Sequence, residues 1–408
     1  MRGSSIFRSI LLFVGLLSTC TLLCVGVVAQ DVGAEVGGGA GVFRAKNPET
    51  KKRAPRTPPI GGAHRLPRAT SAPAQERIED LLDKGNEFRD SRRFAESEQA
   101  YNSVLKIKPR DGRAAYGLGN IYSDQQRWEE AEIAYRNAAT WTPSDVDALV
   151  ALSVVLVQPR TGAGNAKRFA EAESFSRRAV QLQPRNAVAW DRLGVALQAR
   201  GLFNNETENA YRRAVEIDPE FAVAYAHLAR VLNRMGKTSE AQPLYEKALQ
   251  LAKDPPTLNL IAESLQAEQQ WQNSEPVLKR VLDLDARNAT ALYLMGRMML
   301  VFKRYQEAEP YLKLATEVSP RAFQPFNLLG RSYLALDRFE DAELIYERAA
   351  TLASPGDRKQ LGGVYGFEGV GDGFMKMKNK ASAARAYRRA LELDPGNKDL
   401  EQKLSQAS

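Results

Sequence analysis

A spacing of 24 residues between a glycine and a proline recurs along the chain, and a second pattern lies within each spacing. In the second pattern an aromatic residue or leucine follows a small residue by four positions, and another small residue comes three positions later. Self-similarity at a period near 34 residues predicts an array of short repeats and not one globular core. The glycine–proline pairs are Gly85 and Pro109, Gly119 and Pro143, Gly296 and Pro320, and Gly371 and Pro395. The small–aromatic–small sets are Ala131–Tyr135–Ala138, Ala241–Tyr245–Ala248, Ala308–Leu312–Ala315, Ala342–Tyr346–Ala349 and Ala383–Tyr387–Ala390.

Each period contains two helical patterns. Ala115, Leu118, Gly119 and Tyr122 follow the i, i+3, i+4, i+7 spacing of one helix face, and the small–aromatic–small set forms a face of a second helix. The small residues allow two backbones to approach closely, and Pro143 ends the second helix because its ring blocks further helical turns. No alternation of period two follows residue 77, so the sequence predicts no sheet.

These motifs closely resemble those of the tetratricopeptide repeat family, over most of the chain. The resemblance implies an all-α fold, a right-handed superhelical solenoid of antiparallel helix pairs with about nine repeats. The third repeat carries an insertion from Gln158 to Asn165, a spacer from Asp357 to Gly363 precedes the last repeat, and residues 398–408 form a C-terminal capping segment. The array spans 78–397, and the expected repeats are 78–111, 112–145, 146–186, 187–221, 222–254, 255–288, 289–322, 323–356 and 364–397.

Three prolines occupy the same place in successive repeats. Pro243, Pro276 and Pro310 each follow the small residue of the second helix by two positions. Proline is tolerated in a first helical turn, whose amides lack helical acceptors. We therefore expect these second helices to start late enough to place the prolines in their first turns.

Residues 1–29 form a signal peptide or a retained signal anchor. Arg2 and Arg8 precede a nearly continuous apolar run at residues 10–29, and Ala29 ends a small-x-small cleavage pattern. The run is also long enough to span a bilayer, so membrane anchoring through residues 10–29 stays open. Either outcome predicts an exported array, in the periplasm or cell envelope or secreted, with an inner-membrane anchor as the alternative.

Residues 30–77 are expected to be a disordered, basic linker rich in proline and glycine. The formal net charge is +8, and nearly all of the excess lies in the leader and this linker. The repeats are thus close to neutral, which argues against a nucleic-acid groove. Both cysteines, Cys20 and Cys24, lie in the leader, so the array has no thiol chemistry or disulfide.

The sequence shows no catalytic, cofactor or metal site. Only two histidines are present, His64 in the linker and His227 in the array, and no metal-ligand spacing occurs. The glycines at 366, 369, 371 and 373 follow no predicted strand, so they do not indicate a phosphate loop. We therefore expect a binding scaffold and not an enzyme.

The resemblance implies that the first helix of each repeat lines a concave groove where partner peptides lie. The ninth repeat position would point into it, and it holds Asn86, Asn120, Val154, Val195, Arg230, Glu263, Arg297, Arg331 and Asp372. Arginine forks bind carboxylates and asparagine amides bind extended backbone, which suits an extended or acidic segment. Internal pairing, for instance of Arg230 or Arg297 with Glu263, is the alternative. The candidate partner-binding residues are Arg192, His227, Arg230, Asn233, Arg234, Asn259, Tyr293, Arg297, Asn327 and Arg331.

Two functions from different classes follow. The first is a protein–protein interaction adaptor in the cell envelope. The second is a polysaccharide-binding accessory subunit of an export or synthesis complex, which would need aromatic platforms. Only Tyr116, Tyr293 and Tyr365 are candidates for such platforms, so we favour the adaptor.

Overall fold

The computed structural model describes residues 45–50, 71–158 and 164–408. Within these ranges every regular element is an α-helix, which confirms the all-α prediction. None of the described helices is long and apolar enough to cross a membrane. The expected signal or anchor at residues 10–29 and most of the expected linker lie outside the described residues.

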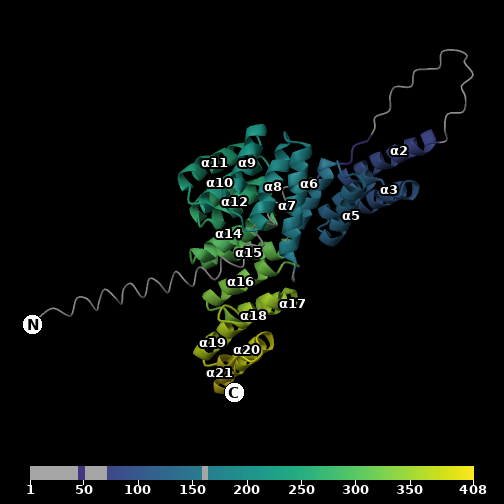
Figure 1. Cartoon of the computed structure of the whole chain (residues 1–408). Coiled ribbons are helices and arrows are strands. Elements are labelled where there is room, and N and C mark those ends of the chain that lie inside the picture. The colour runs from purple at the N-terminus through teal and green to yellow at the C-terminus, as the bar shows by residue number, and fades with distance from the viewer. Residues whose placement is uncertain (1–44, 51–70, 159–163) are drawn as a thin grey trace, which may run out of the picture. The chain divides into compact units, whose positions relative to one another are not determined.

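The helices form two compact units, the first ending at Leu251 and the second running from Ala252 to Ser408. In the first unit each helix packs against the next, so that antiparallel pairs stack on their neighbours (Figure 1). Its helices are α2 (Ser71–Asp90), α3 (Phe94–Ile107), α4 (Gly112–Asp124), α5 (Trp128–Trp141), α6 (Val146–Leu156), α7 (Asn165–Leu182), α8 (Ala187–Ala199), α9 (Asn205–Ile217), α10 (Ala222–Arg234) and α11 (Thr238–Leu251).

The second unit repeats the same pairing. It differs by a short helix, α18, between the last two pairs and by a single helix, α21, at its end. Its helices are α12 (Pro255–Ala267), α13 (Trp271–Leu284), α14 (Ala289–Val301), α15 (Tyr305–Val318), α16 (Phe323–Ala335), α17 (Phe339–Leu352), α18 (Pro355–Gly362), α19 (Phe367–Lys376), α20 (Lys380–Leu393) and α21 (Lys398–Ala407).

Three segments differ from the expected boundaries. The linker prediction is wrong for residues 71–77, which begin α2, because Pro73 falls in a first turn where proline costs no hydrogen bond. It is also wrong for residues 45–50, which lie against α2 and α4. The expected spacer is mostly helix α18, since Ser354 and Asp357 form a capping box that starts a helix there.

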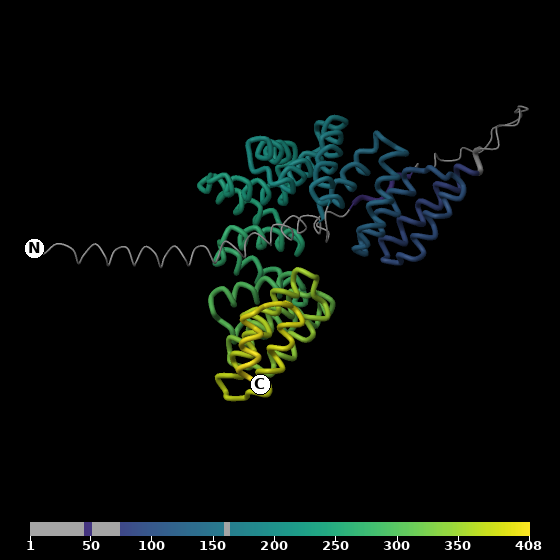
Figure 2. The backbone as a smooth tube through the Cα atoms, turned by 60° about the horizontal axis from the view of Figure 1, so that its bottom comes forward, coloured from purple at the N-terminus to yellow at the C-terminus, as the bar shows by residue number. Residues whose placement is uncertain are grey.

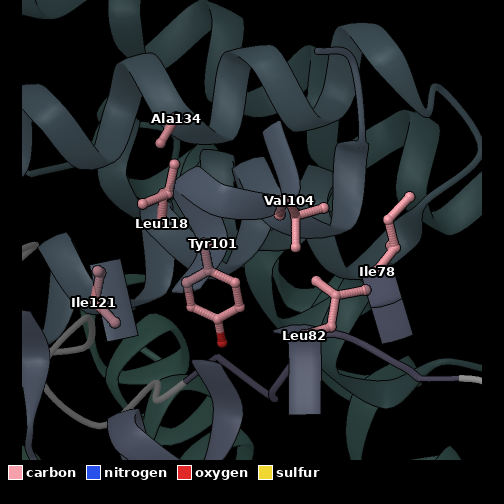
Figure 3. Close-up of a cluster of buried hydrophobic side chains, with 8 residues drawn as sticks. Ile78, Leu82, Tyr101, Val104, Leu118, Ile121 and Ala134 are labelled. Carbon is pink, nitrogen blue, oxygen red and sulfur yellow. The ribbon is translucent and has the colours of Figure 1, made fainter. Parts of the chain in front are cut away.

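In several pairs, close contact between a glycine of the first helix and a large side chain of the second holds the two helices together. A Cβ on Gly119 would lie 2.5 Å from Cδ1 and Cε1 of the Tyr135 ring, and a Cβ on Gly296 would lie 2.4 Å from Leu312. The tyrosines that make these contacts, such as Tyr101 and Tyr135, are fully buried. Figure 3 shows Tyr101 among the apolar side chains of the first pairs, including Leu82, Val104 and Ile121. The recurring glycine and tyrosine are therefore the two halves of one packing contact.

Helix starts and turns also repeat. Several first helices begin at an Asp or Asn whose side chain accepts a backbone N–H of the first turn. The turn within a pair uses a residue with positive φ at a fixed repeat position, and most of these residues are not glycine. The caps include Asp111, Asp145, Asn186, Asp254 and Asn288. The positive-φ turn residues include Arg92, Gln126, Gly201, Gly236, Gln269, Lys303, Asp337 and Lys378.

The expectation for the three prolines is wrong. Helices α11, α13 and α15 begin at Thr238, Trp271 and Tyr305, so Pro243, Pro276 and Pro310 lie inside the helices and beyond the first turn. Each proline removes one backbone hydrogen bond. Packing of the apolar face keeps each helix continuous across this position, because tertiary burial outweighs local propensity.

Candidate functional site

Two asparagines at the ninth repeat position are fixed by tyrosines of the second helices. Tyr101 donates its hydroxyl to Oδ1 of Asn86 on α2 at 2.7 Å. Tyr135 donates in the same way to Oδ1 of Asn120 on α4 at 2.9 Å. Because each Oδ1 accepts from a tyrosine, each Nδ2 is left as a donor with a fixed direction.

Both amide donors bind the backbone of residues 45–50, which we call segment 45–50. The segment has neither helix nor strand, and Figure 2 shows it in purple beside the first helices. Nδ2 of Asn120 donates to the carbonyl of Lys46 at 2.7 Å, and Nδ2 of Asn86 donates to the carbonyl of Pro48 at 3.1 Å. The ninth repeat position of the first two pairs therefore binds peptide backbone in this structure.

Two arginines extend this contact. Arg89, which is almost fully buried, donates from Nη1 to the carbonyl of Ala45 at 2.7 Å and to Oδ1 of Asn47 at 3.0 Å. Its Nε and Nη2 bind the Asp124 carboxylate at 2.8 and 3.0 Å. Burial alone would lower the pKa of Arg89, but Asp124 outweighs it and the pKa is raised. Arg113 donates to the carbonyl of Glu49 at 3.3 Å.

The same repeat position near the C-terminus is occupied differently. Asp372 on α19 accepts the Tyr387 hydroxyl at 2.7 Å and binds Nζ of Lys403 on α21 at 2.7 and 2.8 Å. Glu368 also accepts from Lys403, at 2.8 Å. Lys403 thus ties the terminal helix α21 to two acidic side chains of α19.

Among the predicted groove residues, Arg192 and His227 form a buried charged cluster with Asp191 in the first unit. Asp191 on α8 lies 2.7 Å from Nη2 of Arg192, and its Oδ1 lies 2.8 Å from Nδ1 of His227 on α10. Burial holds the pKa of His227 below its usual range. Burial raises the pKa of Asp191, but the charge of Arg192 and the hydrogen bond with His227 outweigh it and the pKa is lowered. The cluster therefore pairs an ionised carboxylate with a neutral imidazole at neutral pH.

Arg230 lies next to this cluster and is also buried. Its Nη2 donates to Oε1 of Gln198 at 3.1 Å, and the Tyr211 hydroxyl donates to the same oxygen at 2.6 Å. Gln198 thus receives the tyrosine hydroxyl that Asn86 and Asn120 receive in the first two pairs. The arginine is held by the preceding repeat, so its charge reaches the surface only in part.

The last two predicted residues of this unit lie at the end of α10. Asn233 is half-buried and Arg234 is exposed, with the guanidinium carbon of Arg234 5.3 Å from the centre of the Phe203 ring. A cation over an aromatic face is held without losing contact with water. These two side chains therefore present polar groups to solvent.

In the second unit, both predicted asparagines are buried on first helices. Asn259 on α12 donates from Nδ2 to Oδ1 of Asn288 at 2.8 Å, and that oxygen also caps α14. Asn327 lies on α16 with almost no exposed surface. Asn259 therefore supports the join between two repeats.

Tyr293, Arg297 and Arg331 are half-buried and associate with aromatic rings. Arg297 donates from Nε to Oε1 of Gln266 at 3.0 Å, and its guanidinium carbon lies 5.6 Å and 5.8 Å from the ring centres of Trp271 and Tyr293. Arg331 lies 5.0 Å from the centre of the exposed Tyr365 ring. This unit therefore presents guanidinium groups backed by aromatic faces.

The structure thus divides the ten predicted residues into buried supports and surface groups. It adds partners that the sequence analysis did not name, namely Asp191, Gln198 and Gln266. Gln198 and Gln266 share one repeat position, so a polar residue recurring one helical turn after the ninth position is the signal that could have identified them. No comparable signal marked segment 45–50.

Comparison with known proteins agrees with this architecture. Four models of the tetratricopeptide repeat match, at residues 82–156 and 259–323, 210–243, 326–360 and 371–397. Together they cover more than half of the chain. No curated protein matches the chain.

Several solved structures are similar to this chain, and yeast Tom70 shows the same fold. Yeast Tom70 is 15% identical, with a TM-score of 0.54 over 95% of this chain and 78% of its own. MamA from Desulfovibrio magneticus RS-1 is 17% identical, with a TM-score of 0.38 over 43% of this chain and 95% of its own. The TPR protein TTC0263 of Thermus thermophilus is 22% identical, with a TM-score of 0.38 over 47% of this chain and 98% of its own. With its paired helices and the repeat-model matches, the chain belongs to the tetratricopeptide repeat family of protein–protein interaction scaffolds.

Proposed function

We propose that this protein is a non-enzymatic scaffold that binds an extended peptide segment of a protein partner along its first helices. One observation carries the proposal. Side chains of α2 and α4 hold four backbone carbonyls of a peptide segment, those of Ala45, Lys46, Pro48 and Glu49. Recognition through the backbone needs an extended chain.

In the second unit, Arg297 and Arg331 favour a partner segment that carries acidic side chains. Both lie at the ninth repeat position, both are half-buried, and each guanidinium is close to an aromatic ring. A guanidinium fork binds a carboxylate through two parallel hydrogen bonds. Arg230 contributes less, because it is buried and already bound to Gln198.

We also propose that the scaffold works outside the cytoplasm, in the cell envelope or after secretion. The support comes from the sequence alone. Two arginines precede the apolar run at residues 10–29, and Ala29 ends a cleavage pattern. A retained anchor would keep the array at the membrane on the same side.

Binding of a polysaccharide is the other candidate function, and the exposure of the aromatic residues decides how well the protein suits it. Sugar rings stack on exposed aromatic faces. Tyr116 is only 3% exposed and packs near Tyr135, whereas Tyr365 is 63% exposed. One largely exposed tyrosine beside Arg331 makes a short platform, so the peptide-binding proposal has the broader support.

Affinity capture tests the proposal. The full-length protein is immobilised, incubated with extract of its own cells, and compared with a groove variant, Arg297→Glu with Arg331→Glu. The control is Arg213→Glu on α9, whose side chain is exposed and paired only with exposed Glu216 among the ion pairs of the described residues. We expect the groove variant to lose the partner and the control to keep it, with unchanged circular dichroism. Equal capture by all three proteins would refute groove binding.

A further inference from the structure

Segment 45–50 fits its groove in a pattern that specifies the bound sequence. The side chains of Ala45 and Pro48 are buried, whereas those of Lys46 and Glu49 are exposed. Asn47 uses both ends of its amide, since Oδ1 accepts from Arg89 and Nδ2 donates to Asp90 at 2.9 Å. The groove thus reads a small residue, a free position, an asparagine and a proline.

The groove side of this contact is held rigidly by the fold. Asn86 and Asn120 are oriented by buried tyrosine hydroxyls, and Arg89 is anchored by two hydrogen bonds to Asp124. Donors that are already oriented lose little conformational entropy when they bind a ligand. These side chains therefore form a built binding site.

We propose that segment 45–50 is an intramolecular ligand that closes the α2–α4 part of the groove. A partner segment with the same pattern binds there only by displacing it. The displacement step rests on the proposed function, but occupancy by segment 45–50 does not.

Covalent attachment explains how a weakly binding segment keeps the α2–α4 part of the groove occupied. A few hydrogen bonds to carbonyls give modest affinity in a free peptide, but a tethered ligand acts at an effective concentration of about 1 mM. The proline also fixes one backbone angle in advance. A free partner must then bind more tightly than the tethered segment or be present at a higher local concentration. Competition from the segment therefore sets a minimum affinity or concentration for partner binding.

A peptide titration tests occupancy directly. A fluorescent peptide with the sequence of residues 44–51 is titrated with the full-length protein and with the full-length variant Asn47→Ala, Pro48→Ala, and its anisotropy is measured. This variant, which we call the open variant, loses both hydrogen bonds of the Asn47 side chain and the buried Pro48 ring. It keeps the backbone carbonyls, so its segment competes for the groove more weakly than the wild-type segment does. We expect the open variant to bind the peptide at least about 10-fold more tightly than the wild type. The control Lys46→Ala should match the wild type, because its exposed side chain is not recognised.

A second set of variants locates the binding. Asn86→Ala with Asn120→Ala, added to the open variant, should weaken peptide binding about 10-fold or more, whereas Asn102→Ala on the exposed face of α3 should not. Equal peptide affinity of the wild type and the open variant, or no binding to either, would overturn the proposal. So would a wild-type dimer in sedimentation that becomes a monomer with Pro48→Ala, because the segment would then bind a second copy.

Capture of the natural partner separates the two proposals. If the titrations behave as expected but Asn86→Ala with Asn120→Ala captures as much partner as the wild type does, the intramolecular ligand stands and partner binding at α2–α4 is wrong. If partner capture falls with Asn86→Ala, Asn120→Ala and rises with the open variant, the intramolecular ligand and partner binding at α2–α4 are both supported.

Discussion

Adding a single methyl group at Gly119 tests whether close packing of glycine against tyrosine holds the helix pair together. In Gly119→Ala the new Cβ would lie 2.5 Å from two carbons of the buried Tyr135 ring. Ordinary carbon contacts are about 3.5–4.0 Å, so the ring or the helix must move by about 1 Å. Overpacking of this kind costs about 1–3 kcal/mol. Alanine itself gains about 1 kcal/mol over glycine in a helix, so the expected net loss is about 0–2 kcal/mol.

Gly356→Ala is the matched control. Gly356 lies in the first turn of α18, and a Cβ there would meet only Oγ of Ser354, at 4.0 Å. The helix gain is then unopposed, so this variant should be neutral or slightly stabilised. The difference between the two variants isolates the overpacking energy of about 1–3 kcal/mol.

Hydrogen exchange of the native protein is the suitable assay, because repeat arrays can unfold in parts. Amides of α4 and α5 should exchange faster in Gly119→Ala and not in the control. The chain offers a natural rescue. Ala262 and Leu278, both fully buried, hold the places of Gly119 and Tyr135 in another repeat. Tyr135→Leu should therefore reduce the cost of Gly119→Ala in a double-mutant cycle. Equal stabilisation by both alanine variants would refute the close-contact account.

Three further predictions concern the leader, a buried ion pair and pH. Mass spectrometry of the mature protein should find Gln30 as the new N-terminus if the leader is cleaved, whereas an intact Met1 in a carbonate-resistant membrane fraction would support the anchor. Arg89→Met should lower the free energy of unfolding by about 3 kcal/mol, because it removes two charge-assisted hydrogen bonds to the Asp124 carboxylate. Arg213→Met, at an exposed ion pair, should change it far less in urea denaturation; similar effects of both variants would argue against a structural role for Arg89. The pKa of His227 is lower in the folded protein, so the unfolded chain binds more protons as pH falls through about 6.5. Stability that is fully present above that pH is therefore lost below it, and the urea midpoint should fall from pH 7.5 to 5.5 less in His227→Gln than in the wild type. The lowered pKa of Asp191 adds a further loss only below about pH 4, and an unchanged pH profile in His227→Gln would contradict this assignment.

The sequence predicted the helix pairs well because their packing needs particular residue sizes. A close helix crossing requires a glycine such as Gly119 opposite a large side chain such as Tyr135, so the contact appears as a fixed spacing. The turns within the pairs gave no such signal. Gln126 and Lys303 adopt positive φ without being glycine, because the pairs on each side determine the turn.

The candidate site could be predicted only in part. The repeat position of Asn86 and Asn120 follows from periodicity, but the docking of segment 45–50 depends on carbonyl groups, which every residue carries. The composition, rich in proline and glycine, therefore predicted a linker and gave no sign that segment 45–50 would dock on α2 and α4. Similarly, periodicity placed Arg230 on a groove-lining helix, yet its burial depends on Gln198 of the preceding repeat.

Site-specific photo-crosslinking tests groove binding of a protein partner most directly. A photoreactive amino acid is placed at Asn233 on α10 or Arg331 on α16, and at Arg213 on the second helix α9 as the control. Each full-length variant is irradiated in its own cells, and the crosslinked partner is identified by mass spectrometry. We predict that Asn233 and Arg331 crosslink to the same partner and that Arg213 does not. Crosslinks to the partner from Arg213 alone would contradict the account.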